Sequence, residues 1–261
     1  MDILVCVKQV LDTAEIKVDS ATNVINTSRA PLIISPYDAN AVEAAVQLKE
    51  AHGGTVTVLT MGADQAKAVL KESISVGADK GVLLNDNAFQ DSDSYATGYI
   101  LAAAIKKLGN FDLVLCGKQS IDVDAGQVAA QLAEQLGFAQ ITYVSKIDVN
   151  GNVIVVNRQH EDGTEVIEAN LPVVCSVVDA INKPRYATVK SKMAAGKAKF
   201  DVLTAADLPD LDQSMIGANS PTKTLEVYAP PKKASGVRIK EGTAAESGVK
   251  LAKILIAEKV I

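Results

Sequence analysis

The residues best suited to chemistry are gathered in one polar stretch near the middle of the chain, Gly117–Asp124, with the sequence GKQSIDVD. The apolar run Phe111–Cys116 precedes it and predicts a buried strand. A run with good helical spacing follows from Ala125, and Asp124 with Gln127 three residues later fits a capping box that starts a helix. A helix that starts directly after a buried parallel strand presents unpaired N–H groups and its positive dipole end. The pattern indicates a phosphate site, and an ordinary strand–turn–helix with purely structural capping is the alternative.

Other catalytic and metal-binding patterns are missing from the sequence. Cys6, Cys116 and Cys175 lie in separate apolar runs, which favours buried thiols over a disulfide framework or a metal site. His52 and His160 are too far apart to indicate zinc. The sequence has no G-x-G-x-x-G or P-loop motif and no nucleophile elbow. We therefore expect a nucleotide that is held without chemistry on its phosphates.

Composition narrows the class of protein. The 261 residues are 48% hydrophobic and only 4% aromatic, with no Trp, so the core must be built from Val, Ile, Leu and Ala. A net charge of −5 argues against nucleic acid as a partner. The sequence shows no signal peptide and no apolar run near the roughly 20 residues that span a bilayer, so we expect a cytoplasmic protein without membrane insertion.

The first part of the chain alternates strand and helix patterns. The expected strands are Ile3–Val7, Val56–Met61, Gly81–Leu84 and Phe111–Cys116, and the expected helices are Pro36–Ala51, Asp64–Val76 and Asp93–Leu108. This alternation predicts an α/β fold with a doubly wound, mainly parallel sheet. A ligand then lies at the carboxyl ends of the strands, which are Val7-Lys8-Gln9, Met61-Gly62 and Gly117–Gln127.

The pattern changes after the central helix. Strand-like runs separated by Asn-Gly and Asp-Gly turns predict an antiparallel extension at one edge of the sheet, at Ile141–Ile147, Val153–Arg158, Glu165–Glu168 and Val173–Val178. Beyond Ile181 no further sheet pattern is seen, and a last helix is predicted at Ala244–Glu258. We expect residues 1–200 to form one domain, and residues 201–261 to form a C-terminal arm that grips a partner subunit.

Residues Ile181–Phe200, the basic segment, have no acidic residue but carry six cations, Lys183, Arg185, Lys190, Lys192, Lys197 and Lys199. A run of this kind in an acidic chain can steer an acidic partner. A solvated basic face is the alternative.

Five blocks of sequence resemble the β subunit of an electron transfer flavoprotein. They are VCVKQVLDTAEIKVD, SPYDANAVEAAVQLKE, SVGADKGVLL, LVLCGKQSIDVDAGQVAAQLAEQLG and LPVVCSVVDAINKPRYATVKSKMAAGKAK, in register from Met1 to about Lys199. The resemblance implies a nucleotide-binding fold similar to the adenine-nucleotide hydrolase and universal-stress-protein group. It also implies an α subunit as partner, with an electron-shuttling FAD in a mobile domain.

The same resemblance implies the residues of a nucleotide pocket. One set lies under the base and at the start of the first helix: Cys6, Ser35, Pro36, Tyr37, Asp38, Met61 and Gly62. A second set wraps the ribose and phosphates: Gly117, Lys118, Gln119, Ser120, Asp122, Val123, Asp124, Ala125, Gly126, Gln127 and Val128. We expect the N–H groups of Val123, Gly126, Gln127 and Val128 to contact phosphate. Asp122 and Asp124 suit ribose, amide or capping contacts while they are ionised. Ser94 and Thr97 are weaker candidates for the flavin ring.

The variants Val123-Asp124-Ala125-Gly126 and Tyr37-Asp38 resemble the anaerobic, electron-bifurcating branch of the family. There the pocket holds a second FAD that takes a hydride from NADH. One electron goes to the α-subunit FAD and on to an acyl-CoA or hydroxyacid dehydrogenase, and the other to ferredoxin or flavodoxin. This chain would then be an electron carrier subunit of an NADH-linked bifurcating oxidoreductase, with the redox chemistry supplied by the flavin and with no catalytic residue or metal of its own. The alternatives are a conventional subunit that holds structural AMP and a stress-protein-like ATP-binding module.

The basic segment resembles the family's recognition loop, which docks dehydrogenases. The resemblance carries docking roles over to Lys183, Arg185, Tyr186, Val189, Lys190, Lys192 and Met193. The family's usual Leu anchor falls on Val189, a shorter side chain, and Met193 lies one turn further on.

Overall fold

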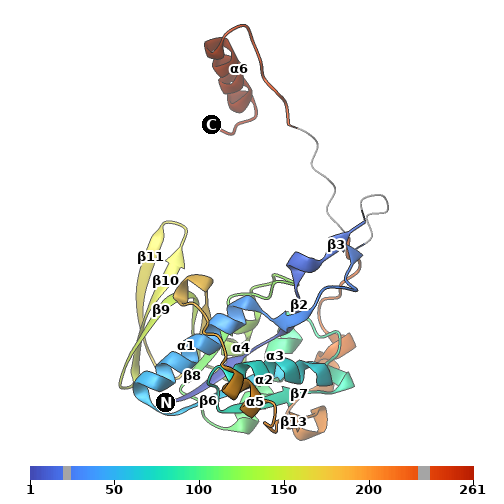
Figure 1. The fold of residues 1–261 in the computed structure, drawn as a ribbon, viewed down its shortest axis with the longest axis vertical. Helices are drawn as coiled ribbons and strands as arrows, with labels where there is room; N and C mark the ends of the chain where they lie inside the picture. The colour runs from blue at the N-terminus through green and yellow to red at the C-terminus, as the bar shows by residue number, and fades with distance from the viewer. Residues whose placement is uncertain (20–24, 229–235) are drawn as a thin grey trace.

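A nine-stranded sheet forms the centre of the molecule in the computed structural model, which describes residues 1–19, 25–228 and 236–261 (Figure 1). Its strands are β1 (Asp2–Cys6), β6 (Thr55–Met61), β7 (Lys80–Leu84), β8 (Leu113–Gly117), β9 (Ala139–Asn150), β10 (Val153–His160), β11 (Gly163–Asn170), β12 (Val173–Val177) and β13 (Asp201–Leu203). They lie in the order β11-β10-β9-β12-β8-β1-β6-β7-β13. All neighbours from β9 to β13 in this order are parallel, and β10 pairs antiparallel with both β9 and β11. The predicted mainly parallel α/β fold with an antiparallel extension is confirmed. The placement of Val173–Val178 in that extension is wrong, because β12 pairs in parallel with β8 and β9 inside the sheet.

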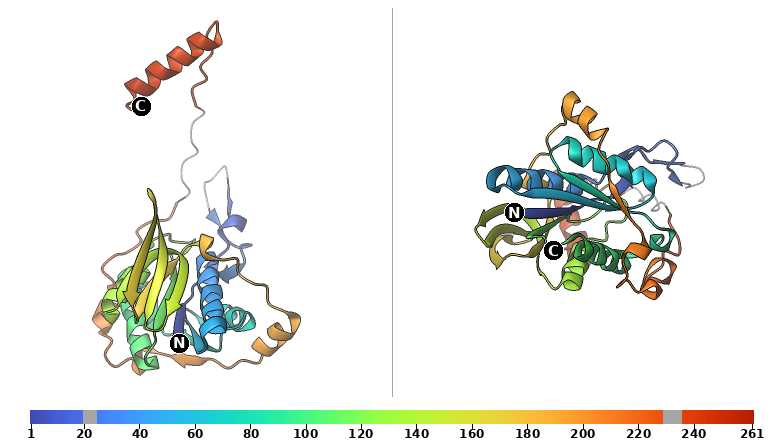
Figure 2. Two further views of the ribbon diagram at one scale, coloured as in Figure 1. Left: turned by 90° about the vertical axis from the view of Figure 1, so that its left-hand side faces the viewer. Right: turned by 90° about the horizontal axis from the view of Figure 1, so that it is seen from below.

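Helices cover both faces of the sheet. Helices α1 (Pro36–His52) and α2 (Lys67–Ser75) lie on one face, and α3 (Ser94–Leu108) and α4 (Val128–Leu136) on the other (Figure 2). Successive side chains of a strand point to opposite faces, so Ile3 and Val5 of β1 pack with α1 and α2 while Leu4 packs with α3 and α4. Because both faces are buried, the central strands are continuous apolar runs, as the sequence shows.

Two short ribbons follow β1 and were not expected from the sequence. Strand β2 (Gln9–Leu11) pairs with β5 (Leu32–Ile34), and β3 (Lys17–Val18) pairs with β4 (Ile25–Asn26). Strands of two or three residues are too short for their side chains to display a period of two. The ribbons leave the sheet at the carboxyl end of β1.

The chain after the basic segment returns to the sheet, so the expectation of no sheet pattern beyond Ile181 is wrong. Strand β13 pairs in parallel with β7, and Leu208, Leu211 and Ile216 are buried in the same cluster as α3. A three-residue strand carries almost no periodic signal and forms because β7 offers an open edge. Residues 201–222, which were expected in the arm, therefore pack on the body.

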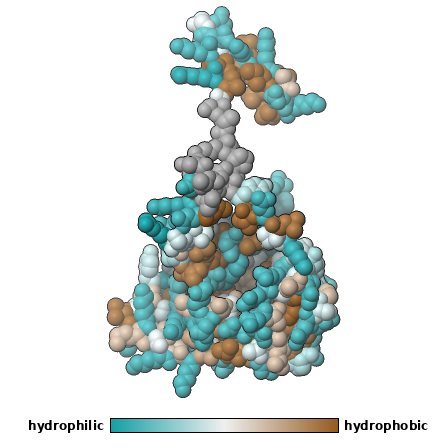
Figure 3. Space-filling model, turned by 90° about the vertical axis from the view of Figure 1, so that its right-hand side faces the viewer, coloured by the Kyte–Doolittle hydropathy of each residue, from teal (hydrophilic) through white to brown (hydrophobic). Residues whose placement is uncertain are grey.

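The end of the chain stands away from the body. Helix α6 (Ala244–Ala257) starts at a capping box formed by Thr243 and Glu246, and it has no buried residue. Figure 1 shows it separated from the sheet, and Figure 3 shows hydrophobic side chains on its surface. The exposed apolar residues of this helix include Val249, Leu251, Ile254 and Ile256. Among the described residues, no helix has the length and apolarity needed to cross a membrane.

Candidate nucleotide site and basic segment

The carboxyl ends of β1 and β8 form the switch point of the sheet. From β1 the chain proceeds through α1 to β6 and then to β7, whereas α3 carries it back to β8 on the other side of β1. The loops that follow β1 and β8 therefore lead in opposite directions, which is where open α/β sheets bind ligands. Lys8 and Lys118 are among the first residues of these two loops.

One buried carboxylate joins the two strand ends. The amide of Lys8 donates to Oδ2 of Asp38 at 2.8 Å, and the amide of Gly117 donates to Oδ1 at 3.0 Å. Burial raises the pKa of Asp38 to about 7, although both amide hydrogen bonds act in the opposite direction. A side chain on Gly117 would not fit, because a Cβ there would lie 2.5 Å from Oδ1 of Asp38 and 2.7 Å from Cβ of Tyr37. The structure thus brings together three residues that the sequence singled out in two separate blocks.

The loop between β8 and α4 is exposed and rich in free donors. Helix α4 begins at Val128, and its N-cap residue Gln127 makes no side-chain capping bond. In the described part of the chain, the amides of Val123, Gly126, Gln127 and Val128 make no backbone hydrogen bond. A helix start of this kind stabilises an anion through its N–H groups and its dipole.

The predicted capping box at Asp124 and Gln127 is wrong. The helix starts later than expected, and Asp124 instead lies within the loop with a φ of 60°. Its amide donates to the carbonyl of Ser120 at 2.8 Å, and its carboxylate accepts from the side chain of Gln119. Gly126 has a φ of 63°, a conformation that other residues adopt only under strain. Two left-handed residues keep the loop out of the helix, and helical spacing from Ala125 gave no sign of them.

The charged side chains around the loop are paired. Nζ of Lys8 lies 2.8 Å from Oδ2 of Asp122, so the first loop is tied to the second. Burial raises the pKa of Asp122, but hydrogen bonds from Lys8 and Ser120 outweigh it and hold that pKa below its usual range. The ammonium of Lys118 lies 4.8 Å from the ring centre of Tyr37, within the range of a cation–π contact.

The start of α3 meets the start of α4. Asp93 caps α3 by accepting from the amide of Ala96 at 2.9 Å. Oγ of Ser94 donates to Oε1 of Gln127 at 2.8 Å, which places Ser94 beside the loop. Thr97 lies in the same first turn of α3.

The remaining predicted pocket residues lie at or beneath the same edge of the sheet. Cys6 ends β1, next to Cys116 of β8, and a hydrogen bond with Cys6 together with burial raises the pKa of Cys116 well above its usual range. The hydroxyl of Ser35 is buried and has no hydrogen-bond partner among the residues that the structure describes. Met61 ends β6, one strand further from β8, and the amide of Gly62, the next residue, donates to the carbonyl of Leu84 at 3.0 Å.

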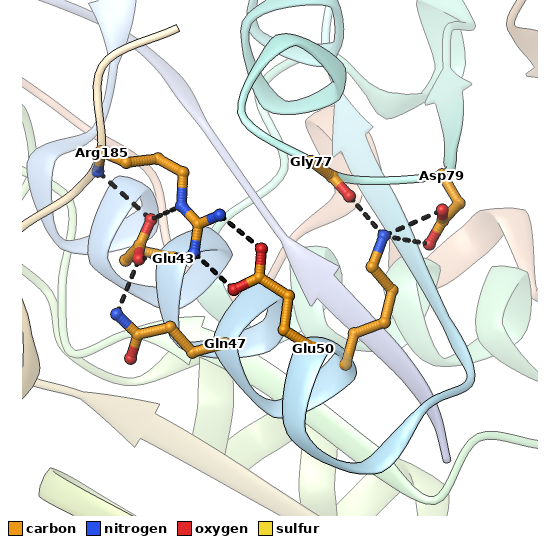
Figure 4. Close-up of polar contacts among 7 residues, drawn as sticks. Glu43, Gln47, Glu50, Gly77, Asp79 and Arg185 are labelled. Atoms are coloured by element: carbon orange, nitrogen blue, oxygen red, sulfur yellow. Dashed lines mark hydrogen bonds and ion pairs between the residues drawn. The ribbon is translucent and has the colours of Figure 1, made fainter.

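The basic segment runs along α1 and then forms a short helix. Asn182 and Asn40 exchange side-chain to backbone hydrogen bonds of 2.9 and 3.0 Å. Arg185 is held by Glu43 and Glu50 of α1, as Figure 4 shows. Helix α5 (Val189–Ala195) follows, capped by Thr188, and packs against α2.

Three predicted docking side chains project from this part of the surface. Tyr186 is 99% exposed, Val189 78% and Met193 68%. Lys183, Lys190 and Lys192 are exposed as well. Apolar side chains of this size surrounded by cations are typical of a site that contacts another protein.

Reasoning from the sequence did not find the ion pairs of these two sites, although it placed Lys8 at the strand end where a ligand was expected. Lys8 carries the ion pair to Asp122, and Glu43 and Glu50 hold Arg185. The position of Lys8 directly after an expected strand end was a usable signal. Glu43 and Glu50 lie seven residues apart, on one face of the predicted helix, but only the path of the basic segment shows what they bind.

The sequence was compared with models of known protein families. A model of the electron transfer flavoprotein domain matches residues 22–208, well over half of the chain. The chain belongs to the electron transfer flavoprotein family. The match includes both the loop after β8 and the basic segment, and membership assigns the chain to electron transport and to a flavoprotein group.

Similar proteins cover the chain from end to end. It is 42% identical, over 100% of both chains, to the electron transfer flavoprotein subunit beta of Megasphaera elsdenii. It is 41% identical, over 100% of both chains, to the caffeyl-CoA reductase-Etf complex subunit CarD of Acetobacterium woodii. The acryloyl-CoA reductase electron transfer subunit gamma of Anaerotignum propionicum is 39% identical over the same share of both chains.

Proposed function

We propose that this chain is the β-type subunit of an electron transfer flavoprotein pair and that it holds FAD at the switch point between β1 and β8. The observation that carries the proposal is the uncapped start of α4, where four predicted phosphate-binding amides make no backbone hydrogen bond. Their position beyond the carboxyl ends of β1 and β8 suits a nucleotide pyrophosphate.

The side chains at the loop fit this group. Repulsion of phosphate by Asp122 is offset by Lys8, and the carboxylate of Asp124 is turned to Gln119. Ala125 and Gly126 are small residues just before the start of α4, so a phosphate could approach the backbone there closely. Tyr37 and Asp38 lie beside Gly117 and would close the opposite side of the site.

We further propose that the pair takes a hydride from NADH and divides its electrons between two acceptors, an acyl-CoA or hydroxyacid dehydrogenase and ferredoxin or flavodoxin. Bound FAD would supply this chemistry, because it accepts a hydride and releases single electrons. The resemblance of the loop to the bifurcating branch supports this proposal, as do relatives whose names place them with caffeyl-CoA and acryloyl-CoA reductases. The protein's own part is to bind, orient and tune the flavin.

The basic segment is the proposed docking surface for the dehydrogenase. Its exposed apolar residues, Tyr186, Val189 and Met193, would contact the partner, and Lys190 and Lys192 would steer the encounter. The α subunit would be bound by α6, whose apolar side chains are exposed in the part of the chain that the structure describes.

The test is the visible spectrum and flavin content of the purified α/β pair. Two FAD per pair, with bleaching by NADH under anaerobic conditions, is the expected result. One FAD together with one AMP would contradict the proposal and identify the conventional, AMP-holding type. A pair that holds ATP in place of a second flavin would identify a nucleotide-binding module instead.

A further inference from the structure

Arg185, at the start of the basic segment, is enclosed by two carboxylates of α1 (Figure 4). Its Nε donates to Oε2 of Glu43 at 2.8 Å, and its Nη1 donates to Oε1 of Glu50 at 2.6 Å. Nη2 is shared between them, at 3.1 Å from Oε1 of Glu43 and 2.9 Å from Oε2 of Glu50. The guanidinium is therefore bound in a forked arrangement to both acids, a geometry that lysine cannot reproduce.

Glu43 makes this contact necessary. Its residue is only 4% exposed, and a buried carboxylate needs hydrogen bonds and a counter-charge. Gln47 and the backbone amide of Arg185 also donate to it, at 2.7 and 3.2 Å. The paired asparagines Asn40 and Asn182 fix the chain just before Arg185. Residues 182–185 are in this way fastened along α1 by side chain and backbone together.

Because the nitrogen atoms of its guanidinium already donate to Glu43 and Glu50, Arg185 is poorly suited to bind a docking partner directly. Its two carboxylates outweigh its single charge, so the cluster as a whole is negative and would not attract an acidic surface. Tyr186, the next residue, is by contrast 99% exposed, and α5 follows three residues later. The orientation of both depends on where the chain is fastened.

We propose that Arg185 is a positioning residue for electron transfer to the dehydrogenase, acting through Glu43 and Glu50 to present Tyr186 and α5. This inference rests on the proposed docking role of the basic segment. It also joins the two functional regions through one helix, because the same α1 carries Tyr37 and Asp38 in its first turn at the nucleotide site.

The two possible roles of Arg185 predict opposite effects of a Glu50 substitution on the strength of docking. Glu50→Gln releases one arm of the guanidinium and removes a negative charge. If Arg185 contacts the partner directly, this change strengthens docking to an acidic surface. If Arg185 positions the segment, it weakens docking. Arg185→Lys separates the roles again, because it keeps the charge but loses the forked geometry.

The experiment uses the intact α/β pair with its dehydrogenase. We expect Glu50→Gln and Arg185→Lys to raise the apparent KM for the dehydrogenase about two- to fivefold, the range for a partly exposed ion pair, and to leave kcat unchanged. Hydrogen–deuterium exchange should rise within residues 181–195 and nowhere else. The matched control is Glu165→Gln, which breaks the pair of Arg158 and Glu165 in β10 and β11, 3.2 Å apart, and should change neither quantity.

A lower or unchanged KM in Glu50→Gln would overturn the positioning role, as would unchanged exchange in the segment. A joint Lys190→Glu and Lys192→Glu variant, measured in parallel, separates this failure from that of the docking function. If that variant weakens docking while Glu50→Gln does not, the docking surface stands and the role of Arg185 is refuted. If neither weakens docking, the docking function itself is wrong.

Discussion

The carboxylate of Asp38 lies 3.0 Å from the amide nitrogen of Gly117 and holds the end of β8 against the start of α1. Its second oxygen accepts from Lys8, so one side chain closes the junction of β1, β8 and α1. The contact leaves no room for a Cβ at Gly117. Burial raises the pKa of Asp38 to about 7, although the two amide hydrogen bonds act in the opposite direction. The candidate nucleotide site therefore rests on a buried carboxyl group whose pKa is raised to about 7.

Asp38→Asn should remove a pH-dependent part of the stability. The pKa of Asp38 rises from 3.8 in the unfolded chain to about 7 in the folded one, so the folded state binds the extra proton between these values. The free energy of unfolding therefore falls as pH rises through this window, by at most about 4 kcal/mol, and levels off above it. Urea unfolding at pH 4.5, 6 and 8 measures the slope, which Asp38→Asn should flatten. Equal slopes in the two proteins would refute the assignment.

Gly126→Glu should empty the nucleotide site. The residue has a φ of 63°, and a carboxylate at the start of α4 would both strain the loop and repel a pyrophosphate. We expect the flavin content of the pair to fall from two to one. Gly151→Glu is the matched control, since Gly151 has a φ of 60° and open space around it in the turn between β9 and β10. Retention of both flavins by the Gly126 variant would disprove the placement.

Reversal of charge at Lys190 and Lys192 should slow delivery of electrons to the dehydrogenase, by roughly tenfold at low ionic strength and less as salt rises. Reduction of the flavin by NADH should be unchanged, because both lysines belong to α5 and not to the loop after β8. Stopped-flow reduction of the dehydrogenase at several salt concentrations measures the delivery of electrons, and anaerobic bleaching of the flavin by NADH measures its reduction. Reversal of Lys106 and Lys107 on α3, across the sheet, makes the same change in net charge and should have little effect.

Val189→Ala should slow the same transfer with little dependence on salt, because a lost apolar contact is not screened. The side chain is 78% exposed, so its removal should leave the melting temperature unchanged. A salt-dependent effect, or none, would show that Val189 is not an anchor.

Truncation should separate the arm from the body. A chain that ends at Lys223 keeps β13, the buried Leu208 and Ile216, and the bond from Thr222 to Asp93, so it should fold with its flavin site intact. It should co-purify with the α subunit less well, because it lacks α6. A chain that ends at Lys199 loses the buried segment as well and should be unstable. Normal pairing by the Lys223 form would assign the subunit contact to the body.

The sequence by itself determined most of the local elements and the place in the chain of the candidate site. Buried strands, amphipathic helices and the Asn150-Gly151 hairpin follow from side-chain periods and turn residues that a short window displays. The free amides after β8 were predictable for the same reason, because a helix start follows a strand within a few residues. The start of helix α4 was harder to predict. Asp124 and Gly126 have left-handed backbone conformations that delay the start to Val128, and residue spacing contains no information about dihedral angles.

The tertiary structure alone decided which distant residues meet. Asp38 and Gly117 are 79 residues apart in the chain, and Glu43 and Arg185 are 142 apart. Each pair forms because the strand order brings two distant segments next to each other. A local sequence pattern does not contain the strand order, so it cannot predict these contacts. The same reason accounts for β13, whose three residues become a strand only against the open edge of β7. The sequence thus specified which backbone donors and charged side chains are present. Packing decided that Asp38 is buried in the first turn of α1 and that Arg185 binds Glu43 and Glu50 further along the same helix.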